Sequence, residues 1–348
     1  MTRRPAPGSE RVLLIGNYGN GNIGDDAILI QMAPEALAHG PVTALSRHPR
    51  RVAVLVPDVE AASMVSLAAL RAFVASDTVV IGGGGMFGRG LPPLVACLPF
   101  VLLAASHLGK QVELRSVGAY PDMPAPVGWA LRKVVLRARH ASARDAASVL
   151  ALGGPHHVTL VRDPAWDLPT GDPEEVRSVL TGAGVGDGHA LIAVSLKPGA
   201  GEPTVGRCVA TVAAGLDRWA ADHEATILFL SFSDKGDYQL GADLTDDHLG
   251  RQLMEAMVHR DRVRLVRPGL HPSVMRGIVE RCDAVVAMRL HAQIFAAAAG
   301  RPVFGLSFEP KCDEFLASIG VAPVRPDRLS ADELVRWLDG SVPQISSR

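Results

Sequence analysis

Short, continuous runs of apolar and β-branched residues recur along the whole chain, and a stretch of helix length separates each run from the next. Such runs are typical of parallel strands, because helices cover both faces of the sheet and every side chain is buried. We expect strands at 11–15, 52–56, 78–81, 112–117, 140–143, 158–161, 191–195, 226–231, 263–266, 284–287 and 303–306.

Between these runs, apolar residues recur at the spacing of one helix face, which predicts helices that pack on the sheets. The expected helices include 27–37, 65–74, 129–137, 205–219 and 249–257. Strands that alternate with helices from end to end indicate the α/β class. We therefore predict two Rossmann-like, doubly wound domains that face each other across a cleft.

The segment from Pro164 to Gly188 is rich in proline and glycine, which marks it as the boundary between the two domains. It holds one short helix, with Asp172 as its N-cap and Pro173 at its first position. The expected parts are an N-terminal domain at 1–165, a C-terminal domain at 186–325, and a final helix and tail at 326–348.

The final helix has a capping box, in which Ser330 is the cap and Glu333 lies three residues later. Leu334, Trp337 and Leu338 then form its apolar face. We expect this helix to pack back across the interdomain region.

The composition and charge of the chain exclude several classes of function. The chain has 348 residues, of which 48% are hydrophobic and 20% are charged, as in a globular protein. Its formal net charge of −1 argues against a bulk electrostatic grip on nucleic acid. The four cysteines are far apart and form no Cys-x-x-Cys pair, so neither a zinc ribbon nor a disulfide framework is indicated, and a cytoplasmic location fits best. They are Cys97, Cys208, Cys282 and Cys312.

Twenty consecutive residues, Gly90 to Gly109, carry no formal charge. The segment contains three prolines and lies between predicted strands of one sheet, so a helix buried against that sheet is the favoured interpretation. A membrane-spanning helix is disfavoured. Peripheral contact with a membrane surface stays open, because an apolar segment of this kind can lie in the lipid interface.

A loop rich in glycine and asparagine, 16–27, follows the first predicted strand and opens the first helix. Its glycines let the backbone approach a ligand, and its amides can bind sugar hydroxyls. The loop contains a G-x-G-x-x-G pattern, but Asp25 and Asp26 follow at once and would repel a pyrophosphate. A hydroxyl-binding loop is therefore favoured over a dinucleotide site, with helix capping by Asp25 as the structural alternative. The candidate binding residues are Asn17, Gly19 and Asn20.

Four glycines, 82–85, directly follow the third predicted strand. Their bare N–H groups favour a pocket floor that holds an anion or a polar substrate. The alternative is a tight crossing between strand and helix that needs small residues. The candidate binding residues are Gly83, Gly84 and Gly85.

Arg289 and His291 stand two residues apart where the strand at 284–287 passes into an alanine-rich helix. Arginine binds carboxylate or phosphate through two parallel bonds, and histidine moves protons near neutral pH. Because the positive end of the helix adds to their charge, we expect this pair to form an anion site that faces solvent.

Three other cations follow predicted strands and are expected near the same chemistry. Lys197 follows the strand that ends at Ser195, and Lys311 follows the strand at 303–306. Arg144 follows the strand at 140–143, where it is either a second anion clamp or half of a structural pair with Asp145.

Three blocks of the sequence resemble the polysaccharide pyruvyl transferase family: 16–27, the glycine run at 82–85, and Met288-Arg-Leu-His-Ala292 with its continuation through 308–316. Their order and spacing fit over most of the chain. The resemblance implies two Rossmann-like halves in a GT-B-like arrangement. It also implies transfer of pyruvate from phosphoenolpyruvate to sugar hydroxyls, typically as a ketal on a cell-surface glycan.

At the positions of this sequence that match the family's motifs, the resemblance implies that Arg289 and His291 contact phosphoenolpyruvate. It also implies that Arg144 is a further member of that site. His291 is then the candidate proton donor, and Asp25 or Asp26 the candidate base for the acceptor hydroxyl. This scheme needs phosphoenolpyruvate as donor substrate and a sugar or glycan acceptor, free or lipid-linked, but no metal and no other cofactor.

Three alternatives remain at the level of sequence. A GT-B-type nucleotide-sugar glycosyltransferase uses the same two-domain architecture. A non-catalytic glycan-binding protein keeps the acceptor loop without the reaction. An NAD-dependent oxidoreductase is weaker, because Asp25 and Asp26 occupy the position of the pyrophosphate.

Overall fold

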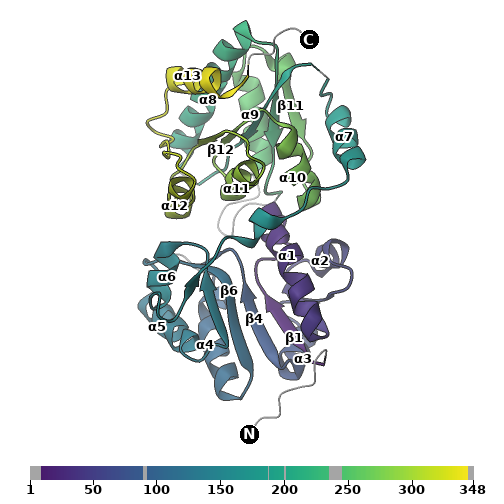
Figure 1. The fold of residues 1–348 in the computed structure, drawn as a ribbon, viewed down its shortest axis with the longest axis vertical. Coiled ribbons are helices and arrows are strands. Elements are labelled where there is room, and N and C mark those ends of the chain that lie inside the picture. The colour runs from purple at the N-terminus through teal and green to yellow at the C-terminus, as the bar shows by residue number, and fades with distance from the viewer. Residues whose placement is uncertain (1–8, 89–91, 187, 200, 235–244, 344–348) are drawn as a thin grey trace. The chain divides into compact units, whose positions relative to one another are not determined.

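The computed structural model describes residues 9–88, 92–186, 188–199, 201–234 and 245–343. Within it the chain divides into two compact units, Met1–Leu168 and Pro169–Arg348, each built around its own parallel sheet (Figure 1). The predicted α/β class is confirmed, since helices alternate with parallel strands through both units.

The first unit has a sheet in the order β3-β2-β1-β4-β6-β7-β8, with the short β5 paired to β6. The pairs described are all parallel, for example β1 with β4, where Leu14 lies beside Val80. Its strands are β1 Val12–Ile15, β2 Val42–Ser46, β3 Glu60–Ser63, β4 Thr78–Gly82, β5 Gly85–Phe87, β6 Gln111–Ala119, β7 His140–Ala143 and β8 Thr159–Leu160. Its helices are α1 Ile23–His39, α2 Pro49–Leu55, α3 Leu67–Ala75, α4 Pro93–His107, α5 Ala125–Val135, α6 Ala146–Leu152 and the 3₁₀ turn η1 Pro164–Asp167.

One predicted strand in this unit is wrong. Residues 52–56 belong to α2, in which Pro49 takes the first turn and only Val52 is buried. The sheet instead uses β2 and β3, which the sequence analysis missed. β3 is an edge strand of Glu, Ala, Ala and Ser, so its pairing comes from its position beside β2 rather than from strand propensity.

The second unit has a five-stranded sheet in the order β11-β10-β9-β12-β13. Its strands match the predicted ones closely: β9 Ala190–Ser195, β10 Ala225–Leu230, β11 Val263–Val266, β12 Ala284–Ala287 and β13 Val303–Gly305. Its helices are α7 Pro173–Gly182, α8 Glu202–Asp222, α9 Asp246–Ala256, η2 Arg260–Arg262, α10 Pro272–Arg281, α11 Leu290–Ala298, α12 Pro310–Ser318 and α13 Ala331–Ser341.

The predicted boundary helix and final helix both pack inside the second unit. Gly171 donates its N–H to the Ser273 carbonyl at 2.8 Å, which ties the segment before α7 to α10. Ser330 caps α13 by accepting from the Glu333 N–H at 3.1 Å, as predicted. However, Leu334 and Leu338 of α13 lie in the core under α8, so this helix does not take the expected place over the interdomain segment.

The uncharged segment near residue 100 forms α4, and this helix is buried on one side only. Pro99, Leu102 and Ala105 face the sheet, whereas Leu94 and Val101 are exposed. The expectation of a helix packed against the sheet is therefore confirmed, and its outer side is exposed. Among the residues that the structure describes, no helix is both long enough and apolar enough to cross a bilayer.

Candidate functional site

Each sheet has a point where the strand order reverses, and the predicted site residues gather at these two points. In the first sheet the reversal lies between β1 and β4, and in the second between β9 and β12. Ligands of doubly wound sheets bind at the carboxyl ends of the strands at such a point, because the two following loops diverge there. The site residues therefore fall into one group per unit.

In the second unit, Arg289 follows β12 and serves as the N-cap residue of α11. Its Nε lies 3.0 Å and 3.2 Å from the two carboxylate oxygens of Asp246. Asp246 opens α9 and also accepts the N–H groups of Phe232 and Ser233 at 3.1 Å and 3.0 Å. The carboxylate thus holds the guanidinium by one edge and fixes its plane.

Both members of the predicted anion pair are buried. Arg289 is 8% exposed and His291, in the first turn of α11, is 9% exposed. The expectation that they face open solvent is corrected by this burial. The burial of Arg289 follows from its salt bridge with Asp246, whose carboxylate is fully buried and holds the guanidinium inside the protein. Sequence reasoning missed Asp246, because an aspartate after Thr245 at a helix start reads as an ordinary first-turn acid.

Lys197 follows β9 on the other side of the same reversal point. Its Nζ lies 3.0 Å from both carboxylate oxygens of Glu309 and 5.3 Å from the centre of the Phe308 ring. Lys311 approaches the same carboxylate at 3.4 Å. Burial by itself raises the pKa of Glu309, but Lys311 and Lys197 outweigh it and hold that pKa below its usual value. Glu309 is therefore ionised at neutral pH and is no candidate for a proton donor.

The described charged groups at this point carry a net positive charge. Arg289, Lys197 and Lys311 supply three positive charges against two negative charges from Asp246 and Glu309. The balance is +1 with His291 counted as neutral. A cationic excess beside a helix N-terminus suits a small anion such as a phosphate ester.

In the first unit, the loop after β1 joins its amides to one carboxylate. Asn17 donates its Nδ2 to Asp25 at 2.6 Å, and Asn20 donates to the Asn17 side-chain oxygen at 3.2 Å. Asn22, rather than Asp25, caps α1, because its side chain accepts from the Gly24 N–H at 3.0 Å. Asp25 is therefore not the cap of α1, and it accepts the last hydrogen bond of a chain of two amides.

Asp26 and Gly19 have a different, structural use. One oxygen of Asp26 accepts the Gly19 N–H at 2.7 Å and the other accepts from Arg51 Nε at 2.9 Å, and the residue is fully buried. Gly19 has φ of +68°, and a Cβ there would lie 2.7 Å from Ser46 Oγ. These two residues hold the loop against β2, so Asp25 is the better placed of the two carboxylates for contact with a substrate.

The glycine run after β4 allows close packing more than it exposes N–H groups. A Cβ at Gly83 would meet Ile28 of α1 at 2.2 Å, and the Gly83 N–H already donates to the Arg115 carbonyl at 2.9 Å. Gly84 has φ of +79° and touches Asp25, with its virtual Cβ 2.8 Å from the carboxylate. The structure thus favours the tight-crossing interpretation at Gly83, while Gly84 brings the backbone against Asp25 of the loop at 16–27.

Gly85 leads to the Arg144 cluster. A Cβ at Gly85 would lie 2.4 Å from the Tyr120 hydroxyl and 3.2 Å from Arg144 Nη2. Arg144 donates to that hydroxyl at 3.1 Å and to Asp163 at 3.2 Å. Burial opposes its charge, but Tyr120, Asp163 and Asp145 keep the pKa of Arg144 above its ordinary value. The guanidinium is therefore permanently charged and is held in an ion pair.

Arg144 was expected from the sequence, but its partner Tyr120 was not. Tyr120 follows β6 and Asp163 follows β8, the two strands that flank β7, and Arg144 follows β7. The strand order was therefore the signal that could have brought the three residues together. The structure joins Asn17, Asn20, Asp25, Gly84, Gly85 and Arg144 into one set at the carboxyl edge of the first sheet.

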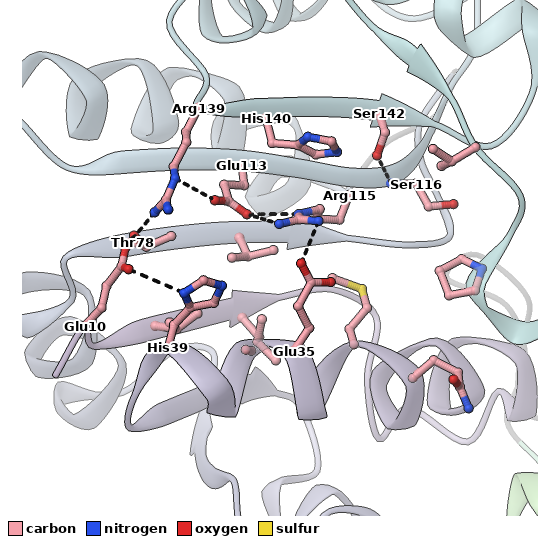
Figure 2. A pocket seen from close by; sticks show the side chains of 18 of the residues that line it. Glu10, Glu35, His39, Thr78, Glu113, Arg115, Ser116, Arg139, His140 and Ser142 are labelled. Carbon is pink, nitrogen blue, oxygen red and sulfur yellow. Dashed lines mark hydrogen bonds and ion pairs between the residues drawn. The ribbon is translucent and has the colours of Figure 1, made fainter. Parts of the chain in front are cut away.

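A cavity of about 320 Å³ lies elsewhere in the first unit, between α1 and the strands β1, β4, β6 and β7 (Figure 2). Arg115 lies 2.8 Å from Glu113 and 3.0 Å from Glu35, and Arg139 lies 3.1 Å from Glu10. With Arg162, the wall holds three guanidinium groups and three carboxylates, so its formal charges cancel. None of the predicted site residues lines this cavity.

Comparison of the sequence with known protein families identifies one family. The model of the family described as polysaccharide pyruvyl transferase matches residues 22–310. Among curated proteins, none matches the chain.

Solved structures resemble the chain over nearly its whole length. UDP-GlcNAc 2-epimerase from Neisseria meningitidis, bound to UDP-GlcNAc, has a TM-score of 0.57 at 11% identity, over 95% of this chain and 90% of that one. HepE from Anabaena, in complex with UDP and glucose, has 0.58 at 15%, over 97% and 93%. The Escherichia coli ADP-heptose lipopolysaccharide heptosyltransferase II has 0.52 at 13%, over 95% and 98%. These likenesses show a two-domain, Rossmann-like GT-B fold.

Proposed function

Because the chain belongs to the polysaccharide pyruvyl transferase family, we propose that it moves pyruvate from phosphoenolpyruvate to hydroxyls of a sugar. The acceptor is a cell-surface polysaccharide or its precursor, free or lipid-linked. The products are a pyruvate ketal and phosphate. The reaction takes place in the cytoplasm and uses no metal or other cofactor beyond the donor.

The observation that carries this proposal is the cationic set at the β9–β12 reversal point. Phosphoenolpyruvate carries a carboxylate and a phosphate, so its site must hold two anionic groups and stabilise the phosphate as it leaves. Arg289, Lys197 and Lys311 supply three cations there, and the local charge stays positive after Asp246 and Glu309 are counted.

The chemistry begins with a proton. Addition of a proton to C3 of phosphoenolpyruvate gives C2 oxocarbenium character, and the first sugar hydroxyl forms a bond to C2 as it loses its own proton. The C2–O bond to phosphate then breaks, and a second hydroxyl of the same sugar closes the ketal and loses a second proton. We assign His291 as the proton donor, since imidazole titrates near neutral pH and Glu309 is held ionised.

We assign acceptor recognition to the first unit. Asn17 and Asn20 form an amide chain that ends on Asp25, and such groups bind the hydroxyls of a sugar. Asp25 is the candidate base for the first hydroxyl, since both oxygens of Asp26 are engaged by Gly19 and Arg51. Arg144 donates to the Tyr120 hydroxyl, and both side chains lie against Gly85, so we assign them the support of the glycine run at 82–85.

The proposal is tested by supplying the purified protein with phosphoenolpyruvate or with UDP-GlcNAc, each with a panel of glycan acceptors. We expect phosphate release that depends on the acceptor, and no UDP release. His291→Ala is expected to abolish that phosphate release without lowering the melting temperature, while His156→Ala, at an exposed position, keeps it. Release of UDP alone would assign the protein to nucleotide-sugar transfer instead. Normal turnover by the His291 variant would remove the proposed acid.

A further inference from the structure

The helices that cover one face of the first sheet carry an unusual number of exposed apolar side chains. α3, α4 and α5 share one core beneath them, which contains Ala69, Leu102 and Leu131. Their outer sides bear nine of the fourteen large apolar residues that are exposed in the described part of the chain, whereas the second unit has one, Val258. The nine, which we call the apolar helix face, are Leu67, Leu70, Val74, Leu94, Phe100, Val101, Leu108, Trp129 and Leu136.

The residues of α4 form a stripe. Leu94, Val101 and the C-cap residue Leu108 are seven residues apart, so they lie along one side of the helix. Their exposed fractions are 50%, 43% and 77%. Cys97, between the first two, is also exposed. Water-facing helices of globular proteins carry polar residues at such positions, so this stripe indicates a surface that is covered by something apolar.

The charges around the stripe select the partner. α3, α4 and α5 contain no aspartate or glutamate, although the whole chain has 36 acidic and 35 basic residues. Exposed cations flank the apolar side chains: Arg71 in α3, Lys133 in α5 and Arg137 just beyond it. The exposed acids nearest to these helices, Asp77 and Asp122, lie beyond their ends. An apolar surface on helices that carry basic residues and no acidic ones is complementary to the headgroups and acyl chains of an anionic bilayer.

Trp129 adds an independent feature. It is 50% exposed on α5, which packs beside α4 (Figure 1). An indole ring is amphipathic, with an apolar body and one N–H, and it is favoured where hydrocarbon meets water. A neighbouring protein would also bury it, but a protein partner gives no reason for the absence of acidic residues on all three helices.

We propose that the apolar helix face docks on a membrane rich in anionic lipids, with the α4 stripe in the interface and the cations at the headgroups. The contact is peripheral. α4 has 15 residues and is about 22 Å long, shorter than the hydrocarbon core of about 30 Å. The docking would hold the enzyme beside lipid-linked acceptors, but it rests on this surface and not on the reaction.

Vesicle sedimentation tests the proposal with the full-length protein. We expect binding to vesicles of phosphatidylglycerol and phosphatidylcholine, weaker binding as salt is raised, and little binding to phosphatidylcholine alone. The pair Lys133→Glu and Arg137→Glu is expected to weaken binding about twentyfold or more. The pair Val101→Ser and Leu108→Ser is expected to do the same by removing buried apolar area. Matched controls in the second unit, Arg207→Glu and Val258→Ser, both at exposed positions, are expected to bind as the wild type does.

Cys97 supplies a second readout, because the other three cysteines are buried. A polarity-sensitive thiol probe on Cys97 is expected to shift its emission to the blue when anionic vesicles are added. The proposal is overturned if the wild type does not sediment with anionic vesicles, or if the control pair weakens binding as much as the α4 and α5 pairs. It is equally overturned if the probe on bound protein does not respond, since contact would then lie elsewhere.

Assembly of a soluble dimer that the α4 variants dissociate, without vesicle binding, would overturn the proposal and assign the apolar helix face to a second copy of the chain. Turnover of a soluble glycan is expected to be unchanged in every variant, which separates this test from that of the proposed function.

Discussion

Arg289 and Asp246, 43 residues apart in the chain, form a buried salt bridge that joins the end of β12 to the start of α9. The carboxylate also accepts two backbone N–H groups that follow β10. One aspartate therefore ties the connection between β10 and α9 to the loop after β12 at the carboxyl edge of the second sheet, and the orientation of the arginine depends on it.

Replacing Asp246 tests that dependence. In Asp246→Asn, the buried guanidinium loses its counter-charge, so we expect the free energy of unfolding to fall by about 3 kcal/mol. The KM for phosphoenolpyruvate should rise as well, because the guanidinium is no longer fixed. Urea denaturation and phosphate release measure the two effects. Asp247→Asn is the matched control, since Asp247 pairs with Arg251 at the surface and should change stability by less than about 0.5 kcal/mol. Equal behaviour of the two variants would contradict this role.

The lysine that follows β9 provides a test of donor binding. Lys197→Met removes a charge-assisted contact worth about 1.5–3 kcal/mol, so the KM for phosphoenolpyruvate is expected to rise roughly tenfold to a hundredfold. Lys197→Arg keeps the charge and should recover part of that loss. Steady-state kinetics of phosphate release measures both, with the exposed Arg177→Met as control. A rise in KM for the glycan, with none for phosphoenolpyruvate, would place the lysine in the acceptor site instead.

The two aspartates at the start of α1 are predicted to behave differently. Asp25→Asn should lower kcat by about 10²–10⁴ with little change in melting temperature, as expected for loss of a general base. Asp26→Asn should lower the free energy of unfolding by about 1.5–3 kcal/mol, because it weakens the bonds to Arg51 and Gly19. Comparing kcat with thermal melting separates the two roles. A full kcat in Asp25→Asn would exclude it as the base.

Gly84 is expected to be sensitive to a single methyl group. Its φ is +79°, and the added Cβ of Gly84→Ala would lie 2.8 Å from the Asp25 carboxylate. We expect a loss of about 1–2 kcal/mol in the free energy of unfolding from the backbone conformation, together with reduced turnover as Asp25 shifts. Gly182→Ala is the control, because nothing lies within 4 Å of its virtual Cβ. It lies within helix α7 and should stabilise the protein slightly. Unchanged turnover in Gly84→Ala would show that Asp25 position is not critical.

His140, in the wall of the charged cavity (Figure 2), makes stability depend on pH. Burial lowers the pKa of His140, and the Arg115 guanidinium lowers it further. The unfolded chain therefore binds the proton first as pH falls. Its contribution to stability is present above the unfolded pKa of about 6.5 and is lost as pH falls toward the folded pKa. Urea denaturation at about pH 7.5 and about pH 5.5 should show a smaller fall in unfolding free energy for His140→Gln than for the wild type. The exposed His156→Gln should keep the wild-type fall, and an unaltered fall in His140→Gln would contradict the assignment.

Most of the fold could be predicted because a parallel sheet buries both faces of its strands. The run at 191–195 is apolar up to its last residue, Ser195, and the run at 284–287 is apolar throughout; they form β9 and β12. The error at 52–56 has the same origin, since Val-Ala-Val-Leu-Val reads as a strand, although Pro49 starts a helix there. β3 contains no β-branched residue, so only its neighbour β2 reveals it.

The candidate site was less predictable because charges were visible and their partners were not. Arg289, Lys197 and Arg144 follow strands, which the sequence reveals directly. Their partners Asp246 and Glu309 come from loops 43 and 112 residues away, and only the strand order brings them together. Burial of Arg289 depends on such a partner, so solvent exposure was wrongly expected from the sequence.

The central claim is that this family member transfers pyruvate from phosphoenolpyruvate to a glycan. An isotope label in the pyruvyl group of the donor tests it most directly. Phosphoenolpyruvate labelled at C2 is incubated with the protein and a glycan acceptor, and the purified glycan is analysed by NMR and mass spectrometry. We predict that the label appears as a ketal carbon on the glycan, in step with phosphate release, and that Arg289→Gln abolishes both. An unlabelled glycan, with every acceptor tested and with the wild-type protein folded, would contradict the account.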